Sequence, residues 1–224
     1  MIRRRADSRA LPGRDERDSG LTTIELIVAM GIFVTVIAIF MSGVVVMTKN
    51  SVRSTVTINA GDSARLVLQR FDKQLRYADA VNLPGAGTGG RQYIEFRTPA
   101  TVAKSGVTTC TQWRWDPATA VIEMRSWADG ATGTMPAFVG VGKGVVADAS
   151  VTTYPFAVEL ASPLHPRQEV TVSLLLTGAE KSKVSAASSF VARNSSVDSP
   201  SNVDTSPTDG VSDSPVCKRT GYRP

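Results

Sequence analysis

The longest apolar run in the chain extends from Leu26 to Met47 and contains no charged residue. Thr35 and Ser42 are its clearly polar members. As a helix with a rise of 1.5 Å per residue, the run is roughly 33 Å long, which is enough to cross the hydrocarbon core of a bilayer. A buried helix of a soluble domain is rarely this long without a charge. The pattern therefore predicts a membrane-spanning helix over residues 21–47.

The flanks of this segment predict its orientation. Residues 1–20 carry six arginines, whereas Lys49 and Arg53 are the nearest cations after the run. Since cytoplasmic flanks are enriched in Lys and Arg, we expect a single-pass protein of the cell membrane, with its N-terminus in the cytoplasm and its head extracellular or periplasmic. A secretory signal peptide is the alternative, but its apolar core has about 7–15 residues and ends in small residues. The run here is longer, so we expect no cleavage on the far side.

Residues 48–81 continue the helical pattern in an amphipathic form. Apolar residues recur at steps of three or four, and charged residues occupy the other faces. The apolar positions are Val52, Val56, Ala60, Ala64, Val67, Phe71, Leu75 and Ala78. This spacing extends the predicted helix to residue 81, with an apolar stripe that needs a partner surface. The periodicity ends at residues 82–85, where Pro84 and Gly85 break it.

Residues 82–193 show the alternation and the turn signals of β-strands. Runs rich in β-branched and aromatic residues are separated by turn residues, for example between Asp116 and Thr119. The expected strands are residues 91–97, 108–115, 120–127, 151–160, 169–177 and 188–193. Together with the amphipathic helix, these strands predict an α+β head in which the helix packs on an antiparallel sheet.

The last segment, residues 194–224, is rich in Ser, Pro, Asp and Thr and poor in apolar residues. Such a segment cannot bury enough apolar surface to offset its ordering entropy, so we expect it to be disordered, with Cys217 as its one anchor. The other cysteine is Cys110, and the sequence contains no CxxC motif. The two cysteines therefore form either a disulfide or a pair of free thiols.

The net charge of +5 does not by itself indicate nucleic-acid binding. Without residues 1–20 the chain keeps 19 basic and 16 acidic residues, and no Lys/Arg stripe remains to displace the counterions of DNA. His165 is the single histidine, and neither a GxSxG motif nor a phosphate-binding loop accompanies it. The sequence thus predicts no enzyme, no cofactor and no metal site.

One short motif joins the charged start of the chain to the apolar run. The residues GLTTIE at positions 20–25 resemble the signal of type IV prepilins and pseudopilins, whose usual form is GFTLIE before an apolar helix. Gly20, Thr22, Ile24 and Glu25 match that form in register, whereas Leu21 replaces the usual Phe. With the arginine-rich flank, the span and the amphipathic continuation, the resemblance covers roughly residues 14–81.

The resemblance implies a site of processing and a site of assembly. A prepilin peptidase would remove residues 1–20 as a cytoplasmic leader by cutting between Gly20 and Leu21, and would methylate the new amine of Leu21. The family counterpart of Glu25 is thought to neutralise the N-terminal amine of a neighbouring subunit and so to set axial register. A carboxylate inside an apolar span costs about 2.5–3.5 kcal/mol, so such residues usually have a function. The alternative is that Glu25 stabilises the helix start alone, where an anion suits the helix dipole.

The head carries a second resemblance. Residues 111–127, TQWRWDPATAVIEMRSW, are similar to a hairpin of J-type minor pseudopilins and related minor pilins. The implied function is that of a minor subunit in a type IV pilus, a competence pilus or a type II secretion-like filament, assembled through the N-terminal helix. The implied partners are other pilin or pseudopilin subunits, the prepilin peptidase and, indirectly, the inner assembly platform and its ATPase. DNA would be a partner through a competence role alone. The alternative is a single-pass anchored binding module or adhesin.

Overall fold

The computed structural model of the chain describes residues 20, 22–178, 183–206 and 211–224. By its internal contacts the chain divides into two units, Met1–Lys49 and Asn50–Pro224. Helix α1, Thr23–Leu75, begins in the first unit and ends in the second. Of the predicted leader and cleavage site, Gly20 is described and exposed, whereas residues 1–19 and Leu21 lie outside the described residues.

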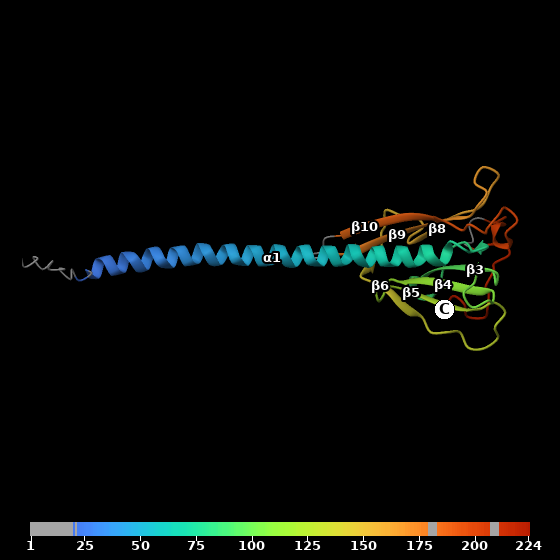
Figure 1. Ribbon diagram of the computed structural model, residues 1–224, viewed down its shortest axis with the longest axis horizontal. Coiled ribbons are helices and arrows are strands. Elements are labelled where there is room, and N and C mark those ends of the chain that lie inside the picture. The colour runs from blue at the N-terminus through green and yellow to red at the C-terminus, as the bar shows by residue number, and fades with distance from the viewer. Residues whose placement is uncertain (1–19, 21, 179–182, 207–210) are drawn as a thin grey trace, which may run out of the picture. The chain divides into compact units, whose positions relative to one another are not determined.

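The second unit contains two antiparallel sheets that pack against the later part of α1 (Figure 1). Sheet A has the order β1-β3-β4-β5-β6 with β2 beside β3, and sheet B has the order β10-β9-β7 with β8 beside β9. The strands of sheet A are β1 (Ala80–Val81), β2 (Gly85–Ala86), β3 (Gln92–Thr98), β4 (Thr109–Asp116), β5 (Val121–Ala128) and β6 (Val139–Lys143). The strands of sheet B are β7 (Val145–Val146), β8 (Phe156–Glu159), β9 (Glu169–Thr177) and β10 (Lys183–Val191). Two short 3-10 helices are η1 (Thr88–Gly90) and η3 (Pro200–Asn202).

Phe71 of α1 lies at the centre of the core of the second unit. Its ring centroid is 5.8 Å from that of Phe96 and 5.2 Å from that of Trp113 in sheet A, and 6.2 Å from that of Phe156 in sheet B. The other buried residues of α1 are Ala60, Ala64, Val67 and Leu75, which belong to the predicted apolar stripe. The prediction of an α+β architecture, with a long N-terminal helix packed on antiparallel strands, is therefore confirmed.

The helix ends earlier than its periodicity predicts. It stops at Leu75, and Ala80–Val81 form strand β1, which pairs with β3. The buried side chain of Gln168 bonds both backbone groups of Val81, accepting from its N–H at 2.9 Å and donating to its carbonyl at 3.1 Å. The prediction of helix up to residue 81 was wrong. Ala78 and Val81 are buried by the sheets, and apolar residues at these positions would be buried whether the backbone were helical or extended, so their spacing does not identify a helix.

The single predicted sheet is in fact two sheets. The chain passes from β6 to β7 through Gly144, whose φ of +76° lies in a region that favours glycine. Strands β6 and β7 were not predicted, because the segment 139–146 contains three glycines, which are depleted in strands. The close approach of β6 to α1 also requires a glycine, since a Cβ on Gly142 would lie 2.5 Å from Cγ2 of Val67.

The prediction of a disordered segment over residues 194–224 was wrong for the part of it that the structure describes. Serines 195, 199, 201 and 212 are buried, as are Val216 and Cys217. Their order comes from polar bonds rather than apolar area. For example, the hydroxyl of Ser199 donates to the carbonyl of Asp79 at 2.6 Å, and that of Ser212 accepts from the N–H of Leu83 at 2.9 Å. Composition underestimates such a segment because the hydroxyls of Ser199 and Ser212 have specific partners elsewhere in the fold.

Candidate functional site

The predicted assembly residue Glu25 lies in the first turn of α1. Its backbone N–H donates to Oγ1 of Thr22 at 3.3 Å, and the N–H of Leu26 donates to the carbonyl of Thr22 at 3.1 Å. Thr22 is therefore the N-cap, and the Thr-x-x-Glu spacing is that of a capping box. The Glu25 residue is exposed, and within the described part of the chain no ion pair forms with its carboxylate.

The stretch of α1 that follows Glu25 buries none of its apolar side chains. Between Ile24 and Met47 the exposed fraction of the large apolar residues runs from 39% at Ile37 to 76% at Met47. The hydroxyls of Thr35 and Ser42 donate to the helix's own carbonyls, those of Gly31 and Ile39. Since these polar groups are satisfied inside the helix, the stretch offers an apolar surface on all sides.

Such a helix is long and apolar enough to span a membrane. A core helix of a soluble domain has the same composition but buries it, and the spanning window of α1 has no buried residue. Exposure of this much apolar surface to water is unfavourable by about 25 cal/mol per Å². The stretch therefore indicates single-pass anchoring or a surface that other helices cover.

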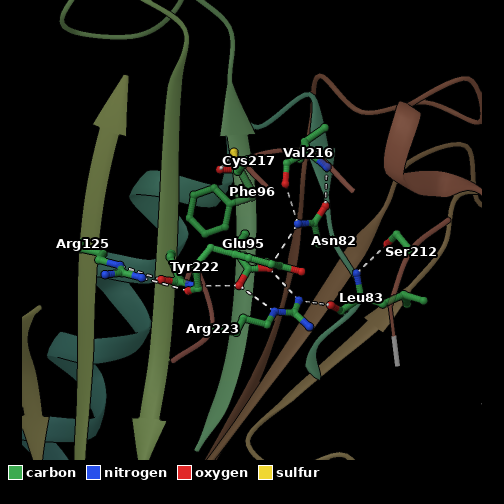
Figure 2. A network of polar contacts seen from close by, with 11 residues as sticks. Asn82, Leu83, Glu95, Phe96, Arg125, Ser212, Val216, Cys217, Tyr222 and Arg223 are labelled. Carbon is green, nitrogen blue, oxygen red and sulfur yellow. Dashed lines mark hydrogen bonds and ion pairs between the residues drawn. The ribbon is translucent and has the colours of Figure 1, made fainter. Parts of the chain in front are cut away.

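A second polar site holds residues 216–224 against sheet A (Figure 2). The guanidinium of Arg223 contacts the fully buried carboxylate of Glu95, with 3.0 Å between Nε and Oε1 and 2.7 Å between Nη2 and Oε2. The remaining bond of Nη2 goes to the carbonyl of Leu83 at 2.8 Å. Burial lowers the pKa of Arg223, but its bond and ion pair with Glu95 outweigh burial and raise that pKa above its usual value. The guanidinium of Arg223 is thus charged in the folded state.

Further contacts continue the same site along the segment. The carbonyl of Tyr222 accepts from Nη2 of Arg125 at 2.9 Å and also from the side chain of Gln112. Burial lowers the pKa of the Arg125 guanidinium, and the nearby charge of Arg114 lowers it further. The side chain of Asn82 bonds both backbone groups of Val216, at 2.9 Å from its N–H and 2.8 Å from its carbonyl. These bonds fix the segment at several successive points.

The two cysteines lie at the same site. Cys110 of β4 and Cys217 are joined by a disulfide that links positions 107 residues apart, with 5.5 Å between their Cα atoms. The sulfurs pack in a small buried cluster with Ala80, Trp127 and Val216. Sequence spacing alone leaves this pairing open.

The remaining predicted residues fall as follows. His165 is exposed in a turn, with its Nδ1 3.6 Å from Oε1 of the equally exposed Glu159. In the described residues no group of three or more His, Cys, Asp or Glu side chains could hold a metal ion. Sequence reasoning missed Glu95, Arg125 and Arg223. Glu95 and Arg125 lie at positions that strand alternation alone assigns to the solvent side, and Arg223 lies in the segment predicted to be disordered, so the sequence carried no signal for this site.

Comparison of the chain with protein-family models, with curated proteins and with solved structures found no match.

Proposed function

We propose that this chain is a type IV pilin-like subunit, namely a minor pilin or pseudopilin of a type IV pilus, a competence pilus or a type II secretion-like filament. The observation that carries the proposal is the sequence GLTTIE at residues 20–25, which leads into the part of α1 up to Met47, where the large apolar side chains are all exposed. A stem of this kind is stable in a bilayer before assembly and among other apolar helices after it. The folded head, residues 50–224, would then contact partners at the filament surface.

Glu25 is the residue that this function needs most. A carboxylate inside an apolar span is costly unless a positive group compensates it. The amine of Leu21 on a neighbouring subunit, freed by cleavage after Gly20, would supply that group. Because a misplaced subunit would leave both charges unpaired in an apolar medium, the pair would set the axial register of the filament. The N-cap geometry at Thr22 is compatible with this role, since it uses the backbone N–H of Glu25 and leaves its carboxylate exposed.

The other proposed partners follow from the same role. They are further pilin or pseudopilin subunits, the prepilin peptidase, and indirectly the inner assembly platform and its ATPase. The proposed orientation places the N-terminus in the cytoplasm and the head outside it. Binding of DNA is proposed only within a competence role, because the sequence after residue 20 shows no Lys/Arg stripe.

A single-pass anchored binding module is a second candidate function. The cap formed by Thr22 favours it, because a capping box is sufficient to explain a Glu at the third position of a helix. In that case Glu25 would have no role beyond the helix start.

The substitution Glu25→Gln separates the two candidates. It keeps the helix and the span but removes the charge, so the proposed function predicts normal membrane insertion and at least about a tenfold loss of co-purification with other prepilin-type subunits from detergent-solubilised membranes, equivalent to about 1.4 kcal/mol. Asp62→Asn is the matched control, because Asp62 is an exposed acid on the same helix outside the apolar stretch. Equal recovery of partner subunits with both variants would contradict the register role of Glu25.

A further inference from the structure

Strand β10 is a long edge strand with a free side. Sheet B begins with β10, which pairs with β9 over nine residues in an unbroken register from Lys183 to Val191. At the end of this ladder the N–H of Ala192 donates to the carbonyl of Gln168 at 3.0 Å. The direction of the backbone groups alternates along an antiparallel strand. The N–H and carbonyl groups of the even-numbered residues of β10 therefore point toward β9, and those of the odd-numbered residues point away from it.

The odd-numbered residues therefore present a row of backbone groups along one side of β10. They are Lys183, Ser185, Ala187, Ser189 and Val191. Within the described residues, no backbone hydrogen bond links this row to another segment. Natural edge strands are usually shortened, bulged or charged, because a free edge pairs readily with other chains.

Apart from Lys183 at its first position, strand β10 has none of these protections, whereas the edge strands β1, β6 and β7 do. Residues 184–191 contain no charge and no proline. By contrast, β1 and β7 have two residues each, and β6 meets β5 at a register shift beside Ile122. The free edge of β10 is thus the place in the described head where another strand can add with the least hindrance.

A groove of about 510 Å³ lies along this edge, between β10 and α1. One wall is formed by Ala186, Ser188 and Phe190, and the other includes Ala64 and Leu68. Gly61 widens the groove further, because a Cβ built on it would meet nothing within 4 Å. A strand that extends sheet B would place every second side chain in this groove, and the small residues on both walls leave room for branched apolar ones.

The charges of the groove define the partner more closely. Asp72 lines the groove but is bound by Arg76 of the same helix, so its charge is compensated. Arg65 also lines the groove, and Lys183 stands at the start of β10, so the local excess is positive. We infer that the free edge of β10 binds an extended segment of another protein, with branched apolar residues at alternate positions and an acidic residue beside them. Its backbone bonds the edge, as in β-strand addition.

A second copy of the chain fits this edge less well. Two β10 strands paired about a two-fold axis would run antiparallel, and the parts of α1 that lie along them would then run in opposite directions. Two chains anchored in one membrane through the same end of α1 cannot adopt that arrangement. The exclusion of a second copy rests on the membrane anchoring of the proposed function, whereas the free edge and the groove belong to the head alone.

The test uses the full-length chain in detergent micelles and a labelled synthetic nine-residue peptide that alternates valine with serine and ends in glutamate. We expect saturable binding by fluorescence polarisation, and slower amide hydrogen exchange at Ala187 and Ser189 when the peptide is present. Ala187→Pro removes one edge donor without removing a bond to β9, and we expect it to weaken binding by about tenfold or more. Ala187→Ser keeps the donor and is the matched control.

A second variant tests the groove and leaves the edge intact. Gly61→Leu fills the open space beside α1 and improves helix propensity. The variant should therefore fold, and its affinity for the peptide should be about tenfold lower than that of wild type. Absence of peptide binding to the wild-type chain, or equal binding by Ala187→Pro, Gly61→Leu and wild type, would overturn the inference. A concentration-dependent dimer that Ala187→Pro abolishes, without peptide binding, would overturn it as well, because the occupant would then be a second copy.

Discussion

The guanidinium of Arg223 and the carboxylate of Glu95 form a buried ion pair across 128 positions of sequence, with 2.7 Å between Nη2 and Oε2. Glu95 is fully buried in the middle of β3, and the side chain of Arg223 is 9% exposed. The pair joins a segment that composition describes as disordered to the centre of sheet A. Order in residues 216–224 therefore contributes to the stability of the whole head.

Removal of one member of this pair should be strongly destabilising. Arg223→Met keeps most of the side-chain volume but leaves the Glu95 carboxylate buried without its cation, which costs about 3–5 kcal/mol. Chemical denaturation of the purified protein measures the loss. The double variant Arg223→Met with Glu95→Gln should recover part of it, because no buried charge remains. A single variant within about 0.5 kcal/mol of wild type would show that the pair is not closed in solution.

The disulfide between Cys110 and Cys217 should also stabilise the head. Because it links residues 107 positions apart, the chain-entropy model gives a stabilisation of about 4–5 kcal/mol, and measured losses for native disulfides are about 2–5 kcal/mol. We expect Cys110→Ser with Cys217→Ser to lower the free energy of unfolding within that range. Thiol labelling of the denatured wild-type protein should find no free cysteine. Two labelled thiols per chain would contradict the bridge.

Gly142 should not tolerate a side chain. A Cβ at this position would lie 2.5 Å from Cγ2 of Val67 and 3.1 Å from Cγ2 of Ile122, and both residues are fully buried. We expect Gly142→Ala to destabilise the head by about 1–3 kcal/mol, as overpacking does elsewhere. Gly133→Ala is the control, because nothing lies within 4 Å of a Cβ there. Equal melting temperatures for the two variants would show that β6 does not pack this closely on α1.

The pair between Asp116 and Arg91 should make stability depend on pH. The carboxylate of Asp116 accepts from Nε of Arg91 at 3.0 Å and from the N–H of Ala118 at 3.0 Å. Burial raises the pKa of Asp116, but the bonds from Arg91 and Ala118 outweigh burial and hold that pKa below its usual value. A lowered folded pKa means that the stabilisation is present above the unfolded pKa of about 3.9 and is lost as the pH falls through the folded pKa.

Asp116→Asn tests this dependence. The difference in free energy of unfolding between wild type and Asp116→Asn should be largest near neutral pH and should shrink as the pH is lowered below about 3.9. Denaturation curves at several pH values measure it. A difference that stays constant across that range would show that the carboxylate charge does not contribute.

Periodicity alone predicted the parts of this molecule that depend on local sequence. The stripe from Ala60 to Leu75 gave the buried face of α1, and the alternation around Trp113 and Met124 gave the β4–β5 hairpin. The division into two sheets could not be predicted, because it depends on one left-handed residue, Gly144, and on pairings between distant strands.

The site around Glu95 was missed for a related physical reason. The bonds between Glu95 and Arg223 and between Asn82 and Val216 join residues more than a hundred positions apart, and hydrogen bonds of this kind leave no periodic trace in sequence. The motif at residues 20–25 is the opposite case, because all of its information is local. Its proposed processing is also the step that most needs a direct measurement.

That measurement is the mass of the N-terminal peptide of the chain, extracted from membranes of cells with an active prepilin peptidase. The proposed function predicts a peptide that begins at Leu21 and carries a methyl group on its amine, and it predicts that Gly20→Leu, which places a bulky side chain beside the bond, retains residues 1–20. A wild-type peptide that still contains residues 1–20 would contradict the assignment of this chain as a pilin-like subunit.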